Sequence, residues 1–242
     1  MQAIQCENLT KCYGDLTAVD RLNLAIEQGE FFSLLGLNGA GKTTAIKLLS
    51  CLSSPTGGDA LVAGNSIKTT PLAVKGCIGV SPQETAVAPH LTVAENLALM
   101  GGVHGLSKEK IRENTTRLAT RLGLGEILHK KAKVLSGGWC RRLSIAMALM
   151  GDPAVLFLDE PTLGLDVLAR RELWQVIREL KGSITILLTT HYMEEAQALS
   201  DRIGVMHKGR LLQVGTPAQL MEKTGATSVE NAFVAIVKGV QQ

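Results

Sequence analysis

A glycine-rich loop that contains a lysine is the clearest chemical feature of the 242-residue sequence. Its segment GLNGAGKT, residues 36–43, matches the phosphate-binding pattern G-x-x-x-x-G-K-[ST]. Glycines let the backbone curl so that successive N–H groups point at phosphate oxygens, and a helix that begins at the loop adds partial positive charge. Lys42 is expected to reach the β- and γ-phosphates, and the Thr43 hydroxyl to bind Mg²⁺. The predicted phosphate-contacting residues are Gly36, Leu37, Asn38, Gly39, Ala40, Gly41, Lys42, Thr43 and Thr44.

Two carboxylates, Asp159 and Glu160, directly follow the apolar run at residues 155–158. At the C-terminal end of a buried parallel strand such groups face the crevice where ligands bind. Asp159 suits a Mg²⁺ ligand, and Glu160 suits a general base that orients water toward the γ-phosphate. Alone, the pair would more often cap a helix; beside the phosphate loop, it predicts a catalytic site.

The segment LSGG at residues 135–138 narrows the choice among phosphate-loop proteins. Together with the phosphate loop, the carboxylate pair, Asp166 in the segment GLD and His191, it makes the chain resemble the ATP-binding subunits of ABC transporters. These motifs stand in the family's order with its usual spacing. The resemblance extends from Tyr13 to about Val237.

In this family two ATP-binding subunits face each other head to tail, and each ATP lies between one subunit's phosphate loop and the other's LSGG segment. The resemblance therefore implies a second ATP-binding subunit, expected to form a homodimer. Ser136, Gly137 and Gly138 would contact the nucleotide held by the partner, through a hydroxyl and the N–H groups of a helix N-terminus. Asp166 would cross the dimer contact, and His191 would touch the γ-phosphate.

The resemblance assigns roles to two further residues and fixes the cofactors as ATP and Mg²⁺. Gln83 is similar to the family's glutamine that senses Mg²⁺, so it is both a catalytic and a metal candidate. Tyr13 matches the aromatic residue that stacks on adenine. Trp139 departs from the family, which often has glutamine after LSGG; a polar contact from this position is therefore not expected.

The elements that must position these residues follow from the apolar runs at 31–35, 154–158 and 183–188, each of which precedes a helical pattern. Continuous apolar strands that alternate with helices predict an α/β fold with a mainly parallel sheet flanked by helices. Residues 202–207 and 210–214 read as a hairpin. The resemblance specifies a P-loop NTPase of the ABC ATPase type, with an N-terminal antiparallel β part.

Residues 89–150 lack strand-like runs and read as a helical subdomain inserted into the core, with Ser107 as a helix cap. We expect one ABC ATP-binding domain over 1–242. Its parts would be an ATPase core (1–88 and 151–215), the helical subdomain and a helical tail (216–242).

Composition limits the possible partners. The chain is 45% apolar and 19% charged, and this apolar content is enough to form a core. Its formal net charge of +3 does not indicate a nucleic-acid partner. Its apolar stretches are too short to cross a bilayer, so we expect no direct membrane insertion. A membrane-spanning permease subunit is implied instead, with this chain on the cytoplasmic side of the cell membrane. Five scattered cysteines fit a reducing compartment.

Three other functions fit the sequence less well. ABC-type proteins of DNA repair carry a very long coiled coil between the phosphate loop and LSGG, whereas the segment from Gln83 to Leu135 is short and has no sustained heptads. Members that act in translation carry two ATP-binding domains in one chain, and this chain has one. A P-loop kinase or GTPase would leave LSGG unexplained, and Glu160 argues against a module that binds ATP without turnover. The segments at 92–97, 169–174 and 193–196 resemble subunits of bacterial exporters for drugs, lipids or polysaccharides, so we expect export rather than import.

Overall fold

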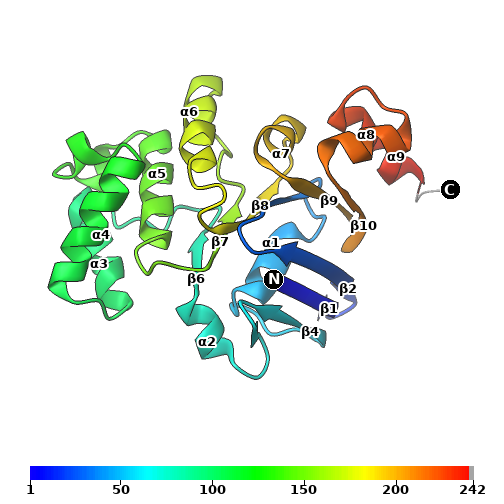
Figure 1. Cartoon of the computed structure of the whole chain (residues 1–242), viewed down its shortest axis with the longest axis horizontal. Coiled ribbons are helices and arrows are strands. Elements are labelled where there is room, and N and C mark those ends of the chain that lie inside the picture. Colours follow the sequence, from blue (N-terminus) through cyan, green and yellow to red (C-terminus); the bar gives the residue numbers. More distant parts are fainter. Residues whose placement is uncertain (240–242) are drawn as a thin grey trace.

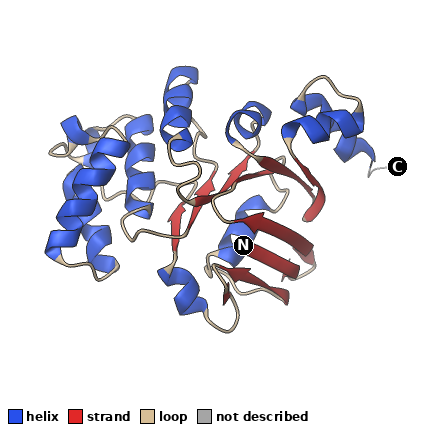
Figure 2. Ribbon diagram, viewed as in Figure 1, coloured by secondary structure: helices blue, strands red, loops and turns tan. Residues whose placement is uncertain are grey.

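Two β-sheets form the framework of the protein in the computed structural model, which describes residues 1–239 (Figures 1 and 2). The larger sheet has six strands in the order β10-β9-β3-β8-β7-β6. The smaller has four, in the order β2-β1-β4-β5. The strands are β1 (Gln2–Tyr13), β2 (Leu16–Glu27), β3 (Phe31–Leu35), β4 (Gly57–Val62), β5 (Asn65–Ser66), β6 (Ile78–Ser81), β7 (Val155–Asp159), β8 (Thr185–Thr190), β9 (Arg202–His207) and β10 (Arg210–Gly215).

The larger sheet is mainly parallel, as predicted. Strands β9, β3, β8, β7 and β6 pair in parallel, and β10 pairs antiparallel with β9 in the expected hairpin. Every residue of β3, β7 and β8 is buried. Successive side chains alternate between the two faces, so Phe157 points toward the smaller sheet while Leu156 and Leu158 point toward helices on the other side. Burial on both faces explains why these strands are apolar throughout.

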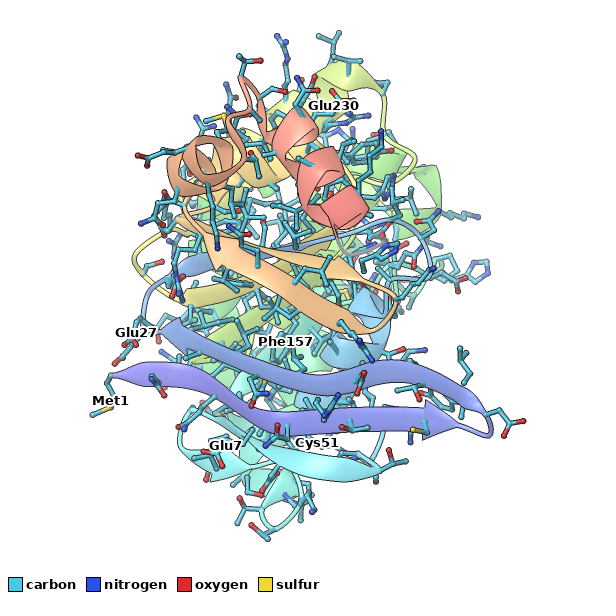
Figure 3. All side chains as sticks on the ribbon, turned by 90° about the vertical axis from the view of Figure 1, so that its right-hand side faces the viewer. Met1, Glu7, Glu27, Cys51, Phe157 and Glu230 are labelled. Carbon is cyan, nitrogen blue, oxygen red and sulfur yellow. The ribbon has the colours of Figure 1, made fainter. Side chains whose placement is uncertain are left out.

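Helix α1 (Lys42–Leu49) follows the phosphate loop and packs between the sheets. Its buried residues Ala45, Ile46 and Leu49 share a cluster with residues of β1, β2 and the larger sheet. Phe157 belongs to this cluster and is labelled in Figure 3 just above the strands of the smaller sheet. The N-terminal strands pair antiparallel, which confirms the N-terminal antiparallel part of the fold prediction.

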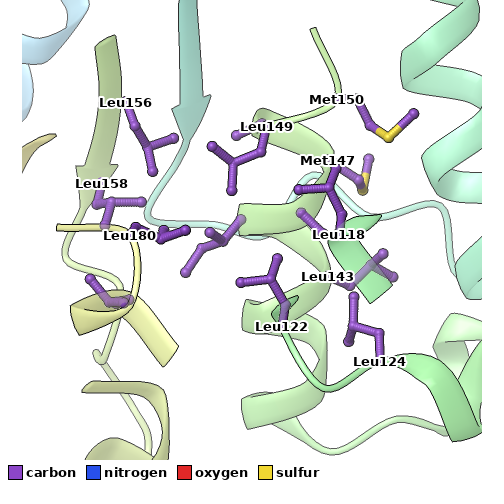
Figure 4. Close-up of a cluster of buried hydrophobic side chains, with 14 of the residues drawn as sticks. Leu118, Leu122, Leu124, Leu143, Met147, Leu149, Met150, Leu156, Leu158 and Leu180 are labelled. Carbon is purple, nitrogen blue, oxygen red and sulfur yellow. The ribbon is translucent and has the colours of Figure 1, made fainter. Parts of the chain in front are cut away.

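The chain between β6 and β7 is helical and lies at one end of the molecule (green in Figure 1). It contains α3 (Val93–Val103), α4 (Lys108–Arg121) and α5 (Gly137–Ala148). Ser107 caps α4 as predicted, because its hydroxyl accepts a hydrogen bond from the Lys110 N–H. Leucines of α4 and α5 share one apolar cluster with Leu156 and Leu158 of β7 (Figure 4).

The remaining helices are α2 (Pro71–Gly76), α6 (Val167–Arg178), α7 (Met193–Leu199), α8 (Pro217–Thr224) and α9 (Val229–Gly239). The expected tail at 216–242 is helical as far as Gly239, and residues 240–242 lie outside the described residues. The boundaries of the core, the helical subdomain and the tail stay predictions. Over residues 1–239, no helix has both the length and the apolar character needed to cross a bilayer.

Candidate nucleotide site

The phosphate loop connects the end of β3 to the start of α1, as the sequence predicts. Its backbone requires glycine at several points: Gly39 has φ +78° and Gly41 has φ +100°, which L side chains rarely adopt. A Cβ at Gly41 would also collide with the carbonyl of Ala18, and one at Gly36 with the carbonyl of Met206. The loop is thus held tightly against β2 and β9, in front of the N–H groups of a helix N-terminus.

Lys42 is the first residue of α1 and is 4% exposed. Its ammonium Nζ donates hydrogen bonds to the carbonyl oxygens of Gly36 (2.8 Å) and Leu37 (3.2 Å). It also pairs with Glu160 Oε1 at 3.1 Å. The loop therefore folds around the lysine, whose charge meets the carboxylate that directly follows β7.

Glu160 connects the lysine to the predicted histidine. Its second oxygen, Oε2, lies 2.9 Å from Nδ1 of His191, which follows β8. The backbone of Glu160 is left-handed with φ +46°, and its N–H is held by the carbonyl and hydroxyl of Thr189, each at 3.1 Å. A non-glycine residue in this conformation is uncommon, and such strain is typically found at functional sites.

The predicted metal ligands Thr43 and Asp159 are in contact. The Thr43 hydroxyl donates to Asp159 Oδ1 at 3.1 Å, and the Thr189 hydroxyl donates to the same oxygen at 2.5 Å. Asp159 is 4% exposed, so these hydroxyls compensate its burial. In this protein the Asp159–Glu160 pair does not cap a helix; it stands between α1 and β8.

An open cavity of about 660 Å³ lies over these groups. It is lined by Tyr13, Leu16, Thr17, Ala18, Asn38, Gly39, Ala40, Gly41, Lys42, Thr43, Thr44, Gln83, Glu160, Leu163, Lys208 and Gly209. Tyr13 is 48% exposed at its rim, with Lys11 Nζ 5.0 Å from the ring centroid. The volume is that of a small-molecule site. Asp159 and His191 stand behind lining residues to which they are hydrogen bonded.

Some lining residues have no counterpart in the sequence analysis. Lys208 and Gly209 form the turn of the β9–β10 hairpin, which was predicted as an element but not as part of the site. Gly209 donates its N–H to the carbonyl of Ala40 at 3.0 Å, which brings the turn onto the phosphate loop. Leu16 and its neighbours reach the cavity through the pairing of β1 with β2. Both placements come from long-range packing that leaves no local signal.

The remaining predicted contacts lie apart from this cavity. Ser136 is the N-cap of α5 and is exposed, with no capping hydrogen bond from its side chain; Gly137 and Gly138 form the first turn. Asp166 caps α6, because its Oδ1 accepts from the N–H groups of Leu168 and Ala169, both at 2.9 Å. None of these four residues lines the cavity that contains Lys42.

Gln83 is the one predicted residue that faces both regions. It lines the larger cavity and also a second cavity of about 400 Å³ that Gly137, Arg141 and Leu165 help to line. Trp139 packs against the helical cluster, and the Arg142 guanidinium lies 4.7 Å from the centroid of its ring. The indole therefore packs within its own chain.

The match to known proteins settles the family. Residues 19–163 match the family model described as ABC transporter. The chain belongs to the ABC transporter family. The predicted membership of the ABC family is thereby confirmed, and the kinase and GTPase alternatives are excluded.

Curated relatives and solved structures of this family agree. The chain is 38% identical over 240 residues to the probable multidrug ABC transporter ATP-binding protein YbhF of Escherichia coli, a match that covers 97% of this chain and 41% of that protein. It is 41% identical over 226 residues to the daunorubicin/doxorubicin resistance ATP-binding protein DrrA of Streptomyces peucetius, covering 93% and 68%. The chain thus spans about two fifths of the length of YbhF.

Among solved structures, an ATP-binding subunit of an ABC transporter superposes with a TM-score of 0.85 at 27% identity, covering 97% of this chain and 99% of that one. A dimeric ATP-binding cassette in a post-hydrolysis state, bound to ADP and Pi, superposes with a TM-score of 0.78 at 27% identity, covering 88% and 98%. The ABC fold of the prediction is therefore confirmed.

Proposed function

We propose that two copies of this ABC subunit bind MgATP between them, head to tail, and hydrolyse it to drive export through a separate membrane-spanning permease. The observation that carries the proposal is the chain of contacts Lys42–Glu160–His191, of which the lysine and the glutamate are buried and line the cavity. It joins a phosphate-binding cation, a carboxylate base and a histidine at the ends of α1, β7 and β8. This arrangement suits the transfer of a phosphoryl group to water.

Each residue of this chain has a distinct task. Lys42 already uses its three N–H bonds on Gly36, Leu37 and Glu160, so a phosphate oxygen must replace one of these acceptors. If the phosphate oxygen takes the place of the Glu160 carboxylate as the acceptor, the lysine binds the phosphate. The carboxylate is then free to accept a proton from water. His191 holds the other carboxylate oxygen and so fixes the direction in which Glu160 points.

The metal site of the proposal consists of Thr43, Asp159 and Gln83. A hydroxyl and a carboxylate 3.1 Å apart beside a phosphate loop are oxygen donors of the type that Mg²⁺ takes, since this ion keeps several waters and binds substrate phosphates. When bound, the ion would neutralise charge that develops on the phosphates. Thr189 orients the Asp159 carboxylate for this purpose.

The dimer of the proposal is supported by the exposed first turn of α5. Ser136 has a free hydroxyl there, and Gly137 and Gly138 leave the N–H groups of a 12-residue helix accessible. A helix N-terminus of this kind binds anions. Because Ser136 does not line the cavity of its own chain, the phosphate that it would contact belongs to the partner subunit, as would the surface that meets Asp166.

Export and the permease partner are supported by the relatives, one described as a probable multidrug transporter protein and another as a resistance protein. We infer a cargo of the drug, lipid or polysaccharide classes and a place on the cytoplasmic face of the cell membrane, attached through the permease. No nucleic-acid partner is part of the proposal.

The test replaces Lys42 with alanine. Lys42→Ala should weaken binding of MgATP by about tenfold or more, because charge-assisted hydrogen bonds contribute roughly 1.5–3 kcal/mol each. It should also abolish release of phosphate. Isothermal titration measures the affinity, and thermal melting checks the fold. Lys47→Ala, an exposed lysine of the same helix, is the matched control. Unchanged ATP affinity in Lys42→Ala would contradict the proposal.

A further inference from the structure

Arg141 stands out because it is buried and does not line the cavity that contains Lys42. It lies in α5, is 6% exposed, and donates from Nη1 to the carbonyl of Pro82 at 2.7 Å and from Nη2 to the carbonyl of Gln83 at 2.8 Å. The planar guanidinium thus donates hydrogen bonds to two successive carbonyls of one loop. A lysine ammonium cannot make both hydrogen bonds with the same geometry. Burial lowers the pKa of Arg141, and the charge of Asp159 partly offsets this.

These two hydrogen bonds belong to a longer line of contacts between α5 and the segment that carries Gln83. Three residues after Arg141, the Ser144 hydroxyl lies 2.9 Å from the hydroxyl of Ser81, and both are buried. One turn further, Ala148 approaches β6 so closely that a Cβ at Gly79 would collide with its carbonyl. Residues at positions i, i+3 and i+7 share one face of a helix.

This face of α5 joins the helix to the loop that carries Gln83. The N-terminus of α5 and the Gln83 loop have different tasks in the proposed reaction. Gln83 lines the cavity of its own chain, whereas Ser136 at the N-terminus of α5 does not. Arg141 lies between them and lines the smaller cavity together with Gln83 and Gly137. Of the side chains in the line of contacts, it is the one that reaches the backbone of Gln83 itself.

We propose that Arg141 is a positioning residue that fixes the Gln83 loop to the helix carrying Ser136, so that a response to Mg²⁺ in one site moves the phosphate-contacting helix end that serves the other. The inference rests on the proposed function, which places Gln83 beside Mg²⁺ and Ser136 at the partner's nucleotide. It adds that the connection runs through two backbone hydrogen bonds and not through general packing.

The experiment compares Arg141→Met, which keeps the apolar stem and loses both hydrogen bonds, with Arg141→Lys, which keeps a charge and a single donor group. Arg141→Met should lower kcat by about tenfold to a hundredfold, the loss expected when a catalytic group is displaced by about 1 Å. The Mg²⁺ concentration for half-maximal ATPase should rise, while ATP affinity measured in EDTA stays unchanged. Arg141→Lys should recover part of the loss.

Two comparisons separate this role from a merely structural one. Arg121→Met removes an arginine that likewise donates to a backbone carbonyl, that of Glu179 at 2.8 Å, far from Gln83; it should leave kcat and the Mg²⁺ dependence as they are. In a Gln83→Ala background, Arg141→Met should cause no further loss, because both changes interrupt the same step.

Wild-type kcat and Mg²⁺ dependence in Arg141→Met, or full additivity with Gln83→Ala, would overturn the inference. If Arg141→Met melts at a lower temperature than the wild type, the test uses Arg141→Lys instead. A wild-type Mg²⁺ dependence of the ATPase of Arg141→Lys would then also overturn the inference. Failure of the proposed function looks different, because Lys42→Ala would then hydrolyse ATP like the wild type.

Discussion

At the scale of single residues, the site depends on where three charged groups are held. Lys42 and Glu160 are each less than 10% exposed and compensate one another at 3.1 Å, and His191 holds the free oxygen of the carboxylate. Breaking such a buried pair by removing one partner leaves an uncompensated charge. A substrate phosphate that takes the place of Glu160 keeps the lysine compensated, because it brings its own negative charge, and the carboxylate keeps its contact with His191.

Trp139 and Gly138 are adjacent but should respond differently to substitution. Trp139 packs inside its own chain, beneath Arg142, so Trp139→Gln should change the ATPase rate by less than about tenfold, or ~1.4 kcal/mol in the barrier. Gly138→Asp should be far worse, because it places a carboxylate where the partner's γ-phosphate must approach in a partly dry interface.

The surroundings of Gly138 allow the cause of the loss of activity in Gly138→Asp to be tested. A Cβ at Gly138 would meet only Ala169 Cβ, at 3.5 Å, which is ordinary contact, and an acidic residue suits the first turn of a helix. Gly138→Asp should therefore keep its melting temperature while losing steady-state ATPase. An equal loss of rate in Trp139→Gln would show that the indole itself is required.

At the scale of elements, the parts that could be predicted are those with local signals. Strands β3, β7 and β8 are continuous apolar runs buried on both faces, and the phosphate loop is a motif. Strands β1 and β2 were expected only from the family resemblance, because their pairing shifts register repeatedly and Asn8 and Arg21 adopt positive φ, which interrupts the alternation of apolar and polar residues. Only the structure places Lys208 at the cavity, because tertiary packing brings the hairpin turn onto the phosphate loop.

Helices α6 and α7 are joined by a buried carboxylate whose titration should affect stability. Glu195 is fully buried, and its Oε1 accepts from the indole N–H of Trp174 at 2.9 Å. Burial raises the pKa of Glu195 above 4.5, although hydrogen bonds and the charge of Arg170 oppose the shift. The folded protein thus binds this proton more tightly than the unfolded chain. The stability it contributes is complete below about pH 4.5 and is lost as pH rises through the folded pKa.

Glu195→Gln removes that titration. The melting temperature of the wild type relative to Glu195→Gln should therefore fall as pH rises from 4.5 toward neutrality. Glu194→Gln, an exposed glutamate of the same helix, is the control and should show no such trend. A constant difference in melting temperature between wild type and Glu195→Gln at all pH values would contradict the assignment.

At the scale of the whole molecule, the proposed function requires two copies of the chain for each site. The cavity with Lys42 and Glu160 opens to solvent, and the free end of α5 with Ser136 contributes nothing to it. Two copies related head to tail would bring each free helix end to the other's cavity and complete both sites at once. A closed twofold pair of this kind is the commonest form of homo-oligomer.

Glu160→Gln should keep ATP binding and stop turnover, because an amide is not a base. The uncleaved nucleotide should then hold two chains together, and light scattering should report twice the mass of one chain with MgATP and a single chain without it. Adding Gly138→Asp to Glu160→Gln should return the protein to a single chain, because the carboxylate repels the phosphate that bridges the two subunits, while ATP still binds at Lys42. A double variant that stays dimeric would show that the chains associate through another surface. Turnover within tenfold of wild type in Glu160→Gln would remove Glu160 from the role of base.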